Sequence, residues 1–286
     1  MFTGKTKNLA VIGSPIEHSL SPAMQNAAIR AAGLDYAYVA LPVLPERLED
    51  GVRGLRALGF RGFNVTIPHK SAILPLLDEV DEAARVVGAV NTVVQEAGKL
   101  KGFNTDVDGF CGALIAHGCS LRGKHVVLFG AGGAARAALY GLFRAGAAKV
   151  TLGVRDAEKA RPLAQAFGRY GEVCVFGWHD GAFAEAVADA AIIVNTTPLG
   201  MAPRMDEMPP VPWDAVRAGA FFYDIIYTPR QTKFLQQAAA HGCPTLNGEA
   251  MLVGQGAAAF ALWTGRQADV SVMTRALREA LEEQRK

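Results

Sequence analysis

The chain has 286 residues, of which 50% are hydrophobic, and its 29 basic and 27 acidic side chains leave a formal net charge of +2. This balance excludes the excess of basic residues that nucleic-acid-binding and membrane-surface proteins carry. A chain of this length predicts two domains, with enough apolar residues for a core in each.

No segment has the composition of an export signal or a membrane anchor. The first 13 residues contain an apolar run of only four residues, which is too short for a signal peptide. The mostly apolar stretch Met251–Trp263 is interrupted by two glycines and Gln255 and is too short to cross a bilayer. The sequence therefore predicts a soluble cytoplasmic protein whose partners are neither nucleic acids nor membranes.

The four cysteines and six histidines are scattered along the chain. Cys111, Cys119, Cys174 and Cys243 show no CxxC or metal-type spacing, which favours free thiols in a reducing compartment over disulfides. The histidines show no HxxxH or HxH spacing, so no metal site is expected.

Short apolar strands alternate with helical segments through the first 117 residues. The expected strands are Leu9–Ile12, Tyr36–Leu41, Gly62–Ile67, Val90–Gln95 and Lys99–Phe103, and the expected helices are Pro22–Ala32, Pro45–Leu58, Leu76–Val87 and Val107–His117. The last two strands are expected to pair through a turn at Ala97-Gly98. This alternation predicts an α/β unit with a mainly parallel sheet.

A second α/β series begins after residues 120–124. Its expected strands, with helices between them, are His125–Phe129, Lys149–Val154, Glu172–Phe176, Ala191–Asn195 and Phe221–Ile225. Two helices, Ala250–Thr264 and Val270–Glu283, follow without a further strand and could pack on either series. The domain change is expected within residues 104–124.

The second series opens with a glycine loop. Residues 125–136, HVVLFGAGGAAR, run from an apolar strand into Gly130-Ala131-Gly132-Gly133 and then into a helix from about Ala134. Glycines allow the backbone to approach a diphosphate closely, and the helix N-terminus offers free N–H groups and a positive dipole end. Because another strand follows at Lys149–Val154, the pattern predicts dinucleotide binding rather than a simple turn.

The end of that next strand bears on the choice of cofactor. It reads Val154-Arg155-Asp156, and Lys159 follows three residues later. An acidic side chain here is typical of NAD sites, where it binds the ribose hydroxyls, and a basic one is typical of NADP sites, where it binds the 2′-phosphate. Arg155 comes first and Lys159 can reach the same phosphate, so NADP is favoured, although Asp156 argues for NAD.

Two serines lie near the first expected helix. In GSPIEHSLSP, residues 13–22, Ser21-Pro22 predicts a helix start with Ser21 as the N-cap. Capping does not explain Ser19. Two hydroxyls at a helix N-terminus make a good seat for a carboxylate.

Other polar residues occupy positions in expected strands and helices where apolar residues are typical. Residues 63–70, FNVTIPHK, predict a strand with Asn64 and Thr66 on one face, ended by Pro68 shortly before Lys70. Asn91 lies in an apolar strand, where an unbonded amide is costly, and Gln255 interrupts an apolar helix. Residues 104–106, NTD, can cap the helix that follows them. Taken singly, each has a structural explanation, but as a set they suit a small polyhydroxylated acid.

The motifs GSPIEHSLSP, FNVTIPHK, GAVNT, GFNTD, GAGGAAR and MLVGQGAAAF occur in this order along essentially the whole chain. Together they resemble the shikimate dehydrogenase family. The resemblance implies a substrate domain of residues 1–106 and 248–286, a Rossmann-type NADP-binding domain of residues 107–247, and a cleft between them. It implies the NADPH-dependent, reversible reduction of 3-dehydroshikimate to shikimate in aromatic amino-acid biosynthesis, by a monomer or homodimer.

The resemblance also implies roles for individual residues. Lys70 and Asp106 would be the catalytic pair, and Ser19 and Ser21 would hold the substrate carboxylate. Further substrate contacts would come from Asn64, Thr66, Asn91, Tyr227 and Gln255. Cofactor contacts would come from Gly130, Ala131, Gly132, Gly133, Ala134, Val154, Arg155, Asp156, Lys159, Ile225 and Gly248. The family often has Asn-Arg-Thr where Val154-Arg155-Asp156 stands here.

The reduction of a ketone needs a hydride on carbon and a proton on oxygen. Nicotinamide carries the hydride, and a protonated lysine can give the proton while it stabilises the charge that develops on oxygen. Lys70 is expected to do this, with Asp106 keeping it charged and in place. One alternative is an NAD-linked quinate/shikimate dehydrogenase. A non-catalytic NADP-binding regulator is a second, but it would require a broken catalytic pair, whereas both residues are present.

Overall fold

The computed structural model describes residues 2–284, which form two compact units. The first unit holds the residues up to Gly109 together with those from Val253 onward, and the second unit is Phe110–Leu252. Helix α4 (Asp106–Ala116) carries the chain from the first unit into the second, and helix α9 (Glu249–Thr264) carries it back.

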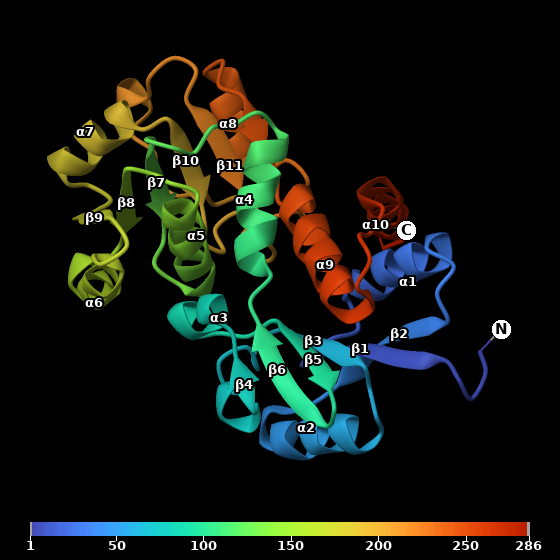
Figure 1. Ribbon diagram of the computed structural model, residues 1–286. Helices are drawn as coiled ribbons and strands as arrows, with labels where there is room; N and C mark the ends of the chain where they lie inside the picture. The colour runs from blue at the N-terminus through green and yellow to red at the C-terminus, as the bar shows by residue number, and fades with distance from the viewer. Residues whose placement is uncertain (1, 285–286) are drawn as a thin grey trace. The chain divides into compact units, whose positions relative to one another are not determined.

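A six-stranded mixed sheet forms the centre of the first unit (Figure 1). Its strands are β1 (Lys7–Gly13), β2 (Tyr36–Pro42), β3 (Gly62–Val65), β4 (Glu79–Val80), β5 (Thr92–Glu96) and β6 (Lys99–Phe103), in the spatial order β2-β1-β3-β5-β6-β4. β1 is parallel to β2 and β3, and β4 is parallel to β6, whereas β5 is antiparallel to β3 and β6. The expected hairpin is confirmed: Ala97 and Gly98 both have positive φ, as a tight two-residue turn requires.

Four helices belong wholly to the first unit: α1 (Ser21–Ala31), α2 (Leu48–Ala57), α3 (Glu82–Val87) and α10 (Val270–Glu283). Leu48, Val52 and Leu55 recur at helical spacing on α2 and are buried in one cluster with Phe63 and Val93 of the sheet. Helices α1 and α10, from distant parts of the sequence, pack side by side (Figure 1).

The prediction of one helix over residues 76–87 is wrong for the first half of this stretch. This stretch holds the end of a 3₁₀ turn (Leu74–Leu76), then β4, and only then the helix α3. The Asp78 carboxylate accepts a hydrogen bond from a β6 amide at 2.7 Å, and Asp81 caps α3 by accepting from the Ala84 amide at 2.8 Å. Aspartates bonded to backbone amides in this way compete with a continuous helix.

Six parallel strands form the sheet of the second unit. They are β7 (His125–Phe129), β8 (Lys149–Val154), β9 (Glu172–Gly177), β10 (Ile192–Asn195), β11 (Phe221–Asp224) and β12 (Thr245–Leu246), in the order β12-β11-β10-β7-β8-β9. Counted from β7, this is the 3-2-1-4-5-6 order of the Rossmann fold. The order reverses between β7 and β10, and such folds bind their ligand at the carboxyl ends of these two strands.

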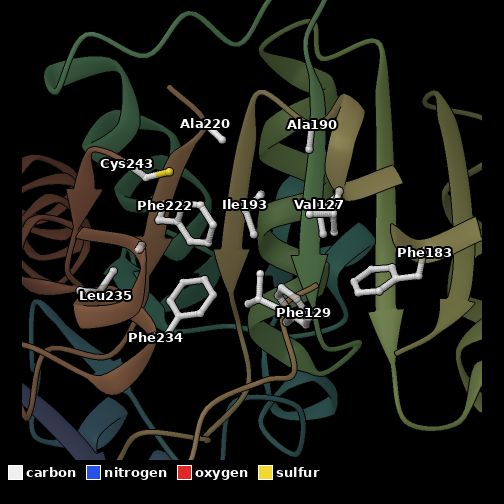
Figure 2. Packing of buried hydrophobic residues seen from close by; sticks show 13 residues of the cluster. Val127, Phe129, Phe183, Ala190, Ile193, Ala220, Phe222, Phe234, Leu235 and Cys243 are labelled. Carbon is white, nitrogen blue, oxygen red and sulfur yellow. The ribbon is translucent and has the colours of Figure 1, made fainter. Parts of the chain in front are cut away.

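Aromatic side chains dominate the core on one side of this sheet. The helices that lie wholly within the unit are α5 (Gly133–Arg144), α6 (Ala157–Phe167), α7 (Gly181–Asp189) and α8 (Lys233–Ala240). Figure 2 shows Phe222 of β11 beside Phe234 of α8, with ring centroids 5.3 Å apart. Phe129 meets Phe183 of α7 edge to face at 5.4 Å. Because Phe129 is the last residue of β7, this packing fixes the strand from which the glycine loop departs.

Trp263 fixes the end of α9 to the first sheet. Its indole Nε1 donates to the Val93 carbonyl at 2.9 Å, and Arg61 Nε donates to the Trp263 carbonyl at 3.1 Å. A Cβ on Gly62 would overlap both the indole ring and the Val93 carbonyl. Only glycine therefore lets the ring lie this close to β3.

This close approach predicts the effect of adding one methyl group. Gly62→Ala should lower the free energy of unfolding by about 1–3 kcal/mol, because the ring and the backbone must move apart. The matched control is Gly54→Ala on α2, where a Cβ meets nothing within 4 Å, so it should be neutral or slightly stabilising. Urea unfolding measures the stability of both variants. Equal unfolding midpoints for the two would contradict the close packing of Trp263 against Gly62.

Candidate active site

A lysine and a carboxylate form a close ion pair beyond the strand ends of the first sheet. Lys70 follows β3 by five residues, and Asp106 is the first residue of α4. Lys70 Nζ lies 2.7 Å from Asp106 Oδ2, and the two side chains are 32% and 18% exposed. The pair is shielded from most of the solvent, which strengthens the attraction between the charges, and enough is exposed for a small molecule to reach it.

Asn91 holds the other oxygen of that carboxylate. Its Nδ2 donates to Asp106 Oδ1 at 2.9 Å and to the Thr105 hydroxyl at 3.0 Å, while its Oδ1 accepts from the Thr105 amide at 2.8 Å. The side chain is buried, and leaving such an amide unbonded would cost about 1–3 kcal/mol. Asn91 therefore keeps the carboxylate in one orientation towards Lys70.

Asn64 extends the same group along β3. Its Nδ2 donates to the Asn91 carbonyl at 2.9 Å and to the Thr92 hydroxyl at 3.0 Å. The structure thus brings four residues predicted for the site into one hydrogen-bonded group: Lys70, Asp106, Asn91 and Asn64.

The two serines lie at the start of α1. Both are half-buried, and Ser19 Oγ accepts a long hydrogen bond from the Ser21 amide at 3.4 Å. The predicted cap is wrong: Leu20 is the N-cap residue, its side chain makes no capping hydrogen bond, and Ser21 is the first residue of the helix. Pro22 occupies the first turn as expected. The Ser21 hydroxyl is therefore not used for capping.

Thr66 and Gln255 are half-buried residues of the same unit. The Thr66 amide donates to the Ile12 carbonyl at 3.0 Å, and its methyl group fills the space that a Cβ on Gly13 would need. Gln255 lies on α9. Tyr227, by contrast, belongs to the second unit, in the chain that follows β11.

Gly130 turns the chain from β7 towards α5. Its φ is +108°, and a Cβ there would lie 3.0 Å from Thr196 Oγ1, so both conformation and space require glycine. At Gly132 and Gly133 a Cβ would meet nothing within 4 Å, and no side chain caps α5. The first N–H groups of an α-helix have no partner within the helix, and with no side-chain cap this helix start suits the diphosphate of a dinucleotide. The other predicted residues of the loop, both half-buried, are Ala131 and Ala134.

The charged residues after β8 are exposed at the start of α6. Val154 is buried, whereas Arg155, Asp156 and Lys159 are exposed. The Asp156 carboxylate caps α6 by accepting from the Lys159 amide at 3.2 Å, and Lys159 Nζ lies 3.9 Å from it. One oxygen of Asp156 is therefore engaged by the helix, and a lysine partly offsets its charge.

A buried carboxylate holds the segment that carries Ile225 and Tyr227. Asp224 accepts hydrogen bonds from the Thr232 hydroxyl at 2.6 Å and from Asn195 Nδ2 at 3.2 Å. Burial raises the pKa of Asp224 to about 6, although these hydrogen bonds lower it. Burial also raises the pKa of Tyr227.

Gly248 packs against the segment that follows β11. A Cβ on Gly248 would overlap the Ile225 carbonyl, and the Gly248 amide donates to the Ile226 carbonyl at 3.0 Å. Two of the predicted cofactor residues, Ile225 and Gly248, therefore lie in direct contact.

Sequence reasoning missed Tyr38, Thr92 and Asp224. The Tyr38 hydroxyl donates to Asn64 Oδ1 at 2.7 Å, and the Thr92 hydroxyl donates to Asn91 Oδ1 at 3.1 Å. Aromatic and β-branched residues are typical of strands, so nothing distinguished these two. Asp224 is different, because a carboxylate that closes the apolar strand FFYD is a signal that could have found it.

Matches to known proteins cover both units. Residues 11–93 match the shikimate dehydrogenase substrate binding domain, residues 248–278 the shikimate 5'-dehydrogenase C-terminal domain, and residues 124–209 the coenzyme F420-dependent NADP oxidoreductase family. The shikimate dehydrogenase (NADP(+)) of Moorella thermoacetica is 48% identical over 275 residues, which cover 96% of this chain and 93% of that protein. The chain belongs to the shikimate dehydrogenase family.

Solved structures of similar proteins differ in what they bind. Shikimate 5-dehydrogenase from Listeria monocytogenes, in complex with shikimate and NAD, is 36% identical with a TM-score of 0.92, over 96% of this chain and 97% of that one. Quinate dehydrogenase from Corynebacterium glutamicum, in complex with NAD, is 34% identical with a TM-score of 0.86, over 96% and 99%. The curated relatives at 43% and 48% identity are nevertheless NADP(+) enzymes, so NADP is the cofactor that the comparisons support for this chain.

Three further features concern residues 2–284. None of their helices is long and apolar enough to cross a membrane. No three of their His, Cys, Asp and Glu side chains are grouped so that they could hold a metal ion. The four cysteines are free thiols, as the sequence predicted.

The raised pKa of Asp224 predicts a pH dependence of stability. Between the usual value of 3.8 and about 6 the folded protein binds more protons than the unfolded chain, so this carboxyl makes the free energy of unfolding fall as pH rises through that window. Asp224→Asn keeps an acceptor oxygen but carries no charge. In this variant the free energy of unfolding should no longer show the fall of about 3 kcal/mol that Asp224 causes across this window.

Urea unfolding at a series of pH values from about 4 to 7 measures this difference between wild type and variant. The exposed Asp214→Asn is the control and should follow the wild type. Parallel curves for wild type and Asp224→Asn would show that Asp224 does not titrate in this window.

Proposed function

We propose that the protein catalyses the NADPH-dependent, reversible reduction of 3-dehydroshikimate to shikimate, a step of aromatic amino-acid biosynthesis. The observation that carries this proposal is the 2.7 Å pair of Lys70 and Asp106, held by the buried Asn91 in a chain of the shikimate dehydrogenase family. A protein that only sensed the cofactor would have no need of this pair.

Lys70 is the proposed proton donor to the ketone oxygen. Its ammonium group stabilises negative charge on that oxygen and then passes it a proton. Asp106 fixes the position of the lysine through the ion pair, while Asn91 keeps the carboxylate from rotating away. In the direction of shikimate oxidation the neutral amine takes the hydroxyl proton back.

The remaining polar groups of the first unit suit the ring substituents and the carboxylate of the substrate. Ser19 and Ser21 are proposed to bind the carboxylate, since both hydroxyls lie at the start of α1, where the helix dipole favours an anion. Thr66 and Gln255 are partly accessible and are proposed to bind ring hydroxyls. From the second unit, Tyr227 is proposed to join them.

The second unit is proposed to bind NADP. The proposed contacts are the glycine loop Gly130–Ala134, the residues Val154, Arg155, Asp156 and Lys159 after β8, and Ile225 and Gly248 beyond β11. When bound, NADPH supplies the hydride. Arg155 and Lys159 would pair with the 2′-phosphate, and the capping role of Asp156 reduces the repulsion that its charge would otherwise add. All of the residues named above come from one chain. The proposed enzyme would therefore be active in the cytoplasm as a monomer or as a homodimer.

An NAD-linked quinate/shikimate dehydrogenase is the rival, because Asp156 remains beside Arg155 and similar proteins are solved with NAD. Initial rates at the absorbance band of reduced nicotinamide, with shikimate or quinate and with NADP or NAD, separate the two. Shikimate with NADP should give the highest kcat/KM. A higher value with NAD, or with quinate, would establish the rival, and no turnover with any pair would overturn both.

Removal of the Lys70 amine should lower kcat far more than it changes KM, because the proton is needed only as charge builds on oxygen. General acid catalysis contributes about 10²–10⁴-fold, so Lys70→Ala should lose about that much. Lys70→Arg should not recover it, since a guanidinium gives up its proton far less readily. The exposed Lys99→Ala should behave as wild type. A normal kcat with a raised KM in Lys70→Ala would instead make Lys70 a binding residue.

The charges after β8 should decide between the two cofactors. Arg155→Ala should raise KM for NADP at least tenfold and leave KM for NAD nearly unchanged, since about 1.5–3 kcal/mol is lost with a charged hydrogen bond. Asp156→Ser retains a helix cap while it removes the charge, so it should favour NADP further. Arg161→Ala, exposed on the same helix, is the control. An equal loss with both cofactors in Arg155→Ala would show that Arg155 does not bind the 2′-phosphate.

A further inference from the structure

Another buried carboxylate lies at the start of α9, within the second unit. The Glu249 side chain is 7% exposed, and its Oε1 lies 3.2 Å from Nε of Arg230, whose own side chain is 60% exposed. A buried carboxylate is costly unless it is paired, and a helix start favours its negative charge. Glu249 is therefore a fixed point, and it holds an arginine that would otherwise sample many rotamers in solvent.

The backbone of Arg230 is held by the same stretch of chain. Asn247 Nδ2 donates to the Arg230 carbonyl at 3.1 Å, and Asn247 Oδ1 accepts from the Glu249 amide at 3.1 Å. The carbonyl and the guanidinium of Arg230 are thus both tied to residues 247–249. Arg230, Asn247 and Glu249 together form a clamp on the chain that follows β11.

The same chain is also tied a few residues earlier. The Ile226 amide donates to Asp224 Oδ1 at 3.1 Å, and the Ile226 carbonyl accepts from the Gly248 amide at 3.0 Å. Tyr227 is the next residue, and it opens a stretch of three residues between Ile226 and Arg230. Fixing both ends of so short a stretch removes most of the backbone conformations that it could otherwise adopt.

Ile225 is held without the help of the clamp. Its amide donates to the Asn195 carbonyl at 3.2 Å, and its own carbonyl packs against Gly248 so closely that a Cβ there would overlap it. Loss of the bond between Arg230 and Glu249 should therefore loosen Tyr227 and leave Ile225 in place.

From this geometry we infer that Arg230 and Glu249 are positioning residues, which hold Tyr227 where it can bind the substrate. This inference rests on the proposed function, in which Tyr227 binds the substrate and Ile225 binds the cofactor. The ion pair acts through the backbone of residues 227–230. Neither of its members stood out in the sequence as a residue of the site.

Arg230→Ala removes the guanidinium and leaves the Asn247 bond to the backbone, so the segment loosens but does not unfold. The value of kcat/KM for shikimate should fall about three- to tenfold, which corresponds to one hydrogen bond from Tyr227. KM for NADP should stay unchanged, because Ile225 is held separately. Arg230→Lys keeps a cation that can reach a carboxylate by a single contact, so it should recover most of the loss.

Two comparisons separate positioning from a general loss of stability. In a Tyr227→Phe background, Arg230→Ala should cost little, because the hydroxyl that the clamp positions is already absent. Glu249→Gln should reproduce the loss seen in Arg230→Ala, and the double variant should be little worse than either. Lys233→Ala removes an exposed cation just beyond the same segment, and this matched control should behave as wild type.

Four results would overturn the inference. They are an unchanged kcat/KM in Arg230→Ala, an equal loss with and without the Tyr227 hydroxyl, KM values for shikimate and NADP that rise alike, and additive losses in the double variant.

A readout without turnover keeps the inference distinct from the proposed function. The ring resonances of Tyr227, observed by NMR and assigned by their absence in Tyr227→Phe, should move in Arg230→Ala and in Glu249→Gln and remain in place in Lys233→Ala. Resonances that stayed in place in Arg230→Ala would overturn the positioning itself. If the wild type did not turn over shikimate, the proposed function would fall, whereas the resonances would still show whether the clamp holds Tyr227.

Discussion

The chemistry of the first unit depends on the need to satisfy one buried amide. Asn91 lies just before β5 and is buried, and among residues 2–284 its side chain finds its partners in Thr105, Thr92 and Asp106. Meeting that requirement brings the end of β6 and the start of α4 against β5. Asp106 then has one oxygen for the amide and one for Lys70. A rigid carboxylate beside a partly exposed lysine is thus a consequence of hydrogen-bond satisfaction in the strands.

The second unit reaches its ligand-binding form through packing and backbone conformation instead. Phe129 is held between Phe183 and Phe234, so β7 ends at a defined point, and Gly130 makes the turn that no other residue allows. Polar side chains act near the strand ends, where the exposed Asp156 caps α6 and the buried Asp224 holds the segment after β11. This division suits a nucleotide, because backbone N–H groups at a helix start bind phosphates and one charged side chain can distinguish NADP from NAD.

Much of this could be predicted from the sequence, for reasons that differ between elements. Apolar runs located the strands of the second unit, because buried parallel strands are continuous in hydrophobicity. The continuous helix predicted over residues 76–87 was wrong because Asp78 and Asp81 bond to backbone amides. Hydrophobic periodicity does not reveal such bonds. Lys70, Asp106 and Asn91 stood out through motifs, whereas Tyr38 did not, since its role arises only when β2 and β3 are placed in register with β1.

The bond between Trp263 and Val93 spans 170 residues, and this has a consequence for biosynthesis. As the chain emerges from the ribosome, β3 and β5 appear early, but the indole that covers them appears after the whole of the second unit. The second unit is one continuous segment and can fold as soon as it emerges, since domains generally fold as units during translation. The first unit must wait with Gly62 and its neighbours uncovered. The domain that is translated first is therefore completed last, and the nascent protein exposes an apolar surface for most of its synthesis.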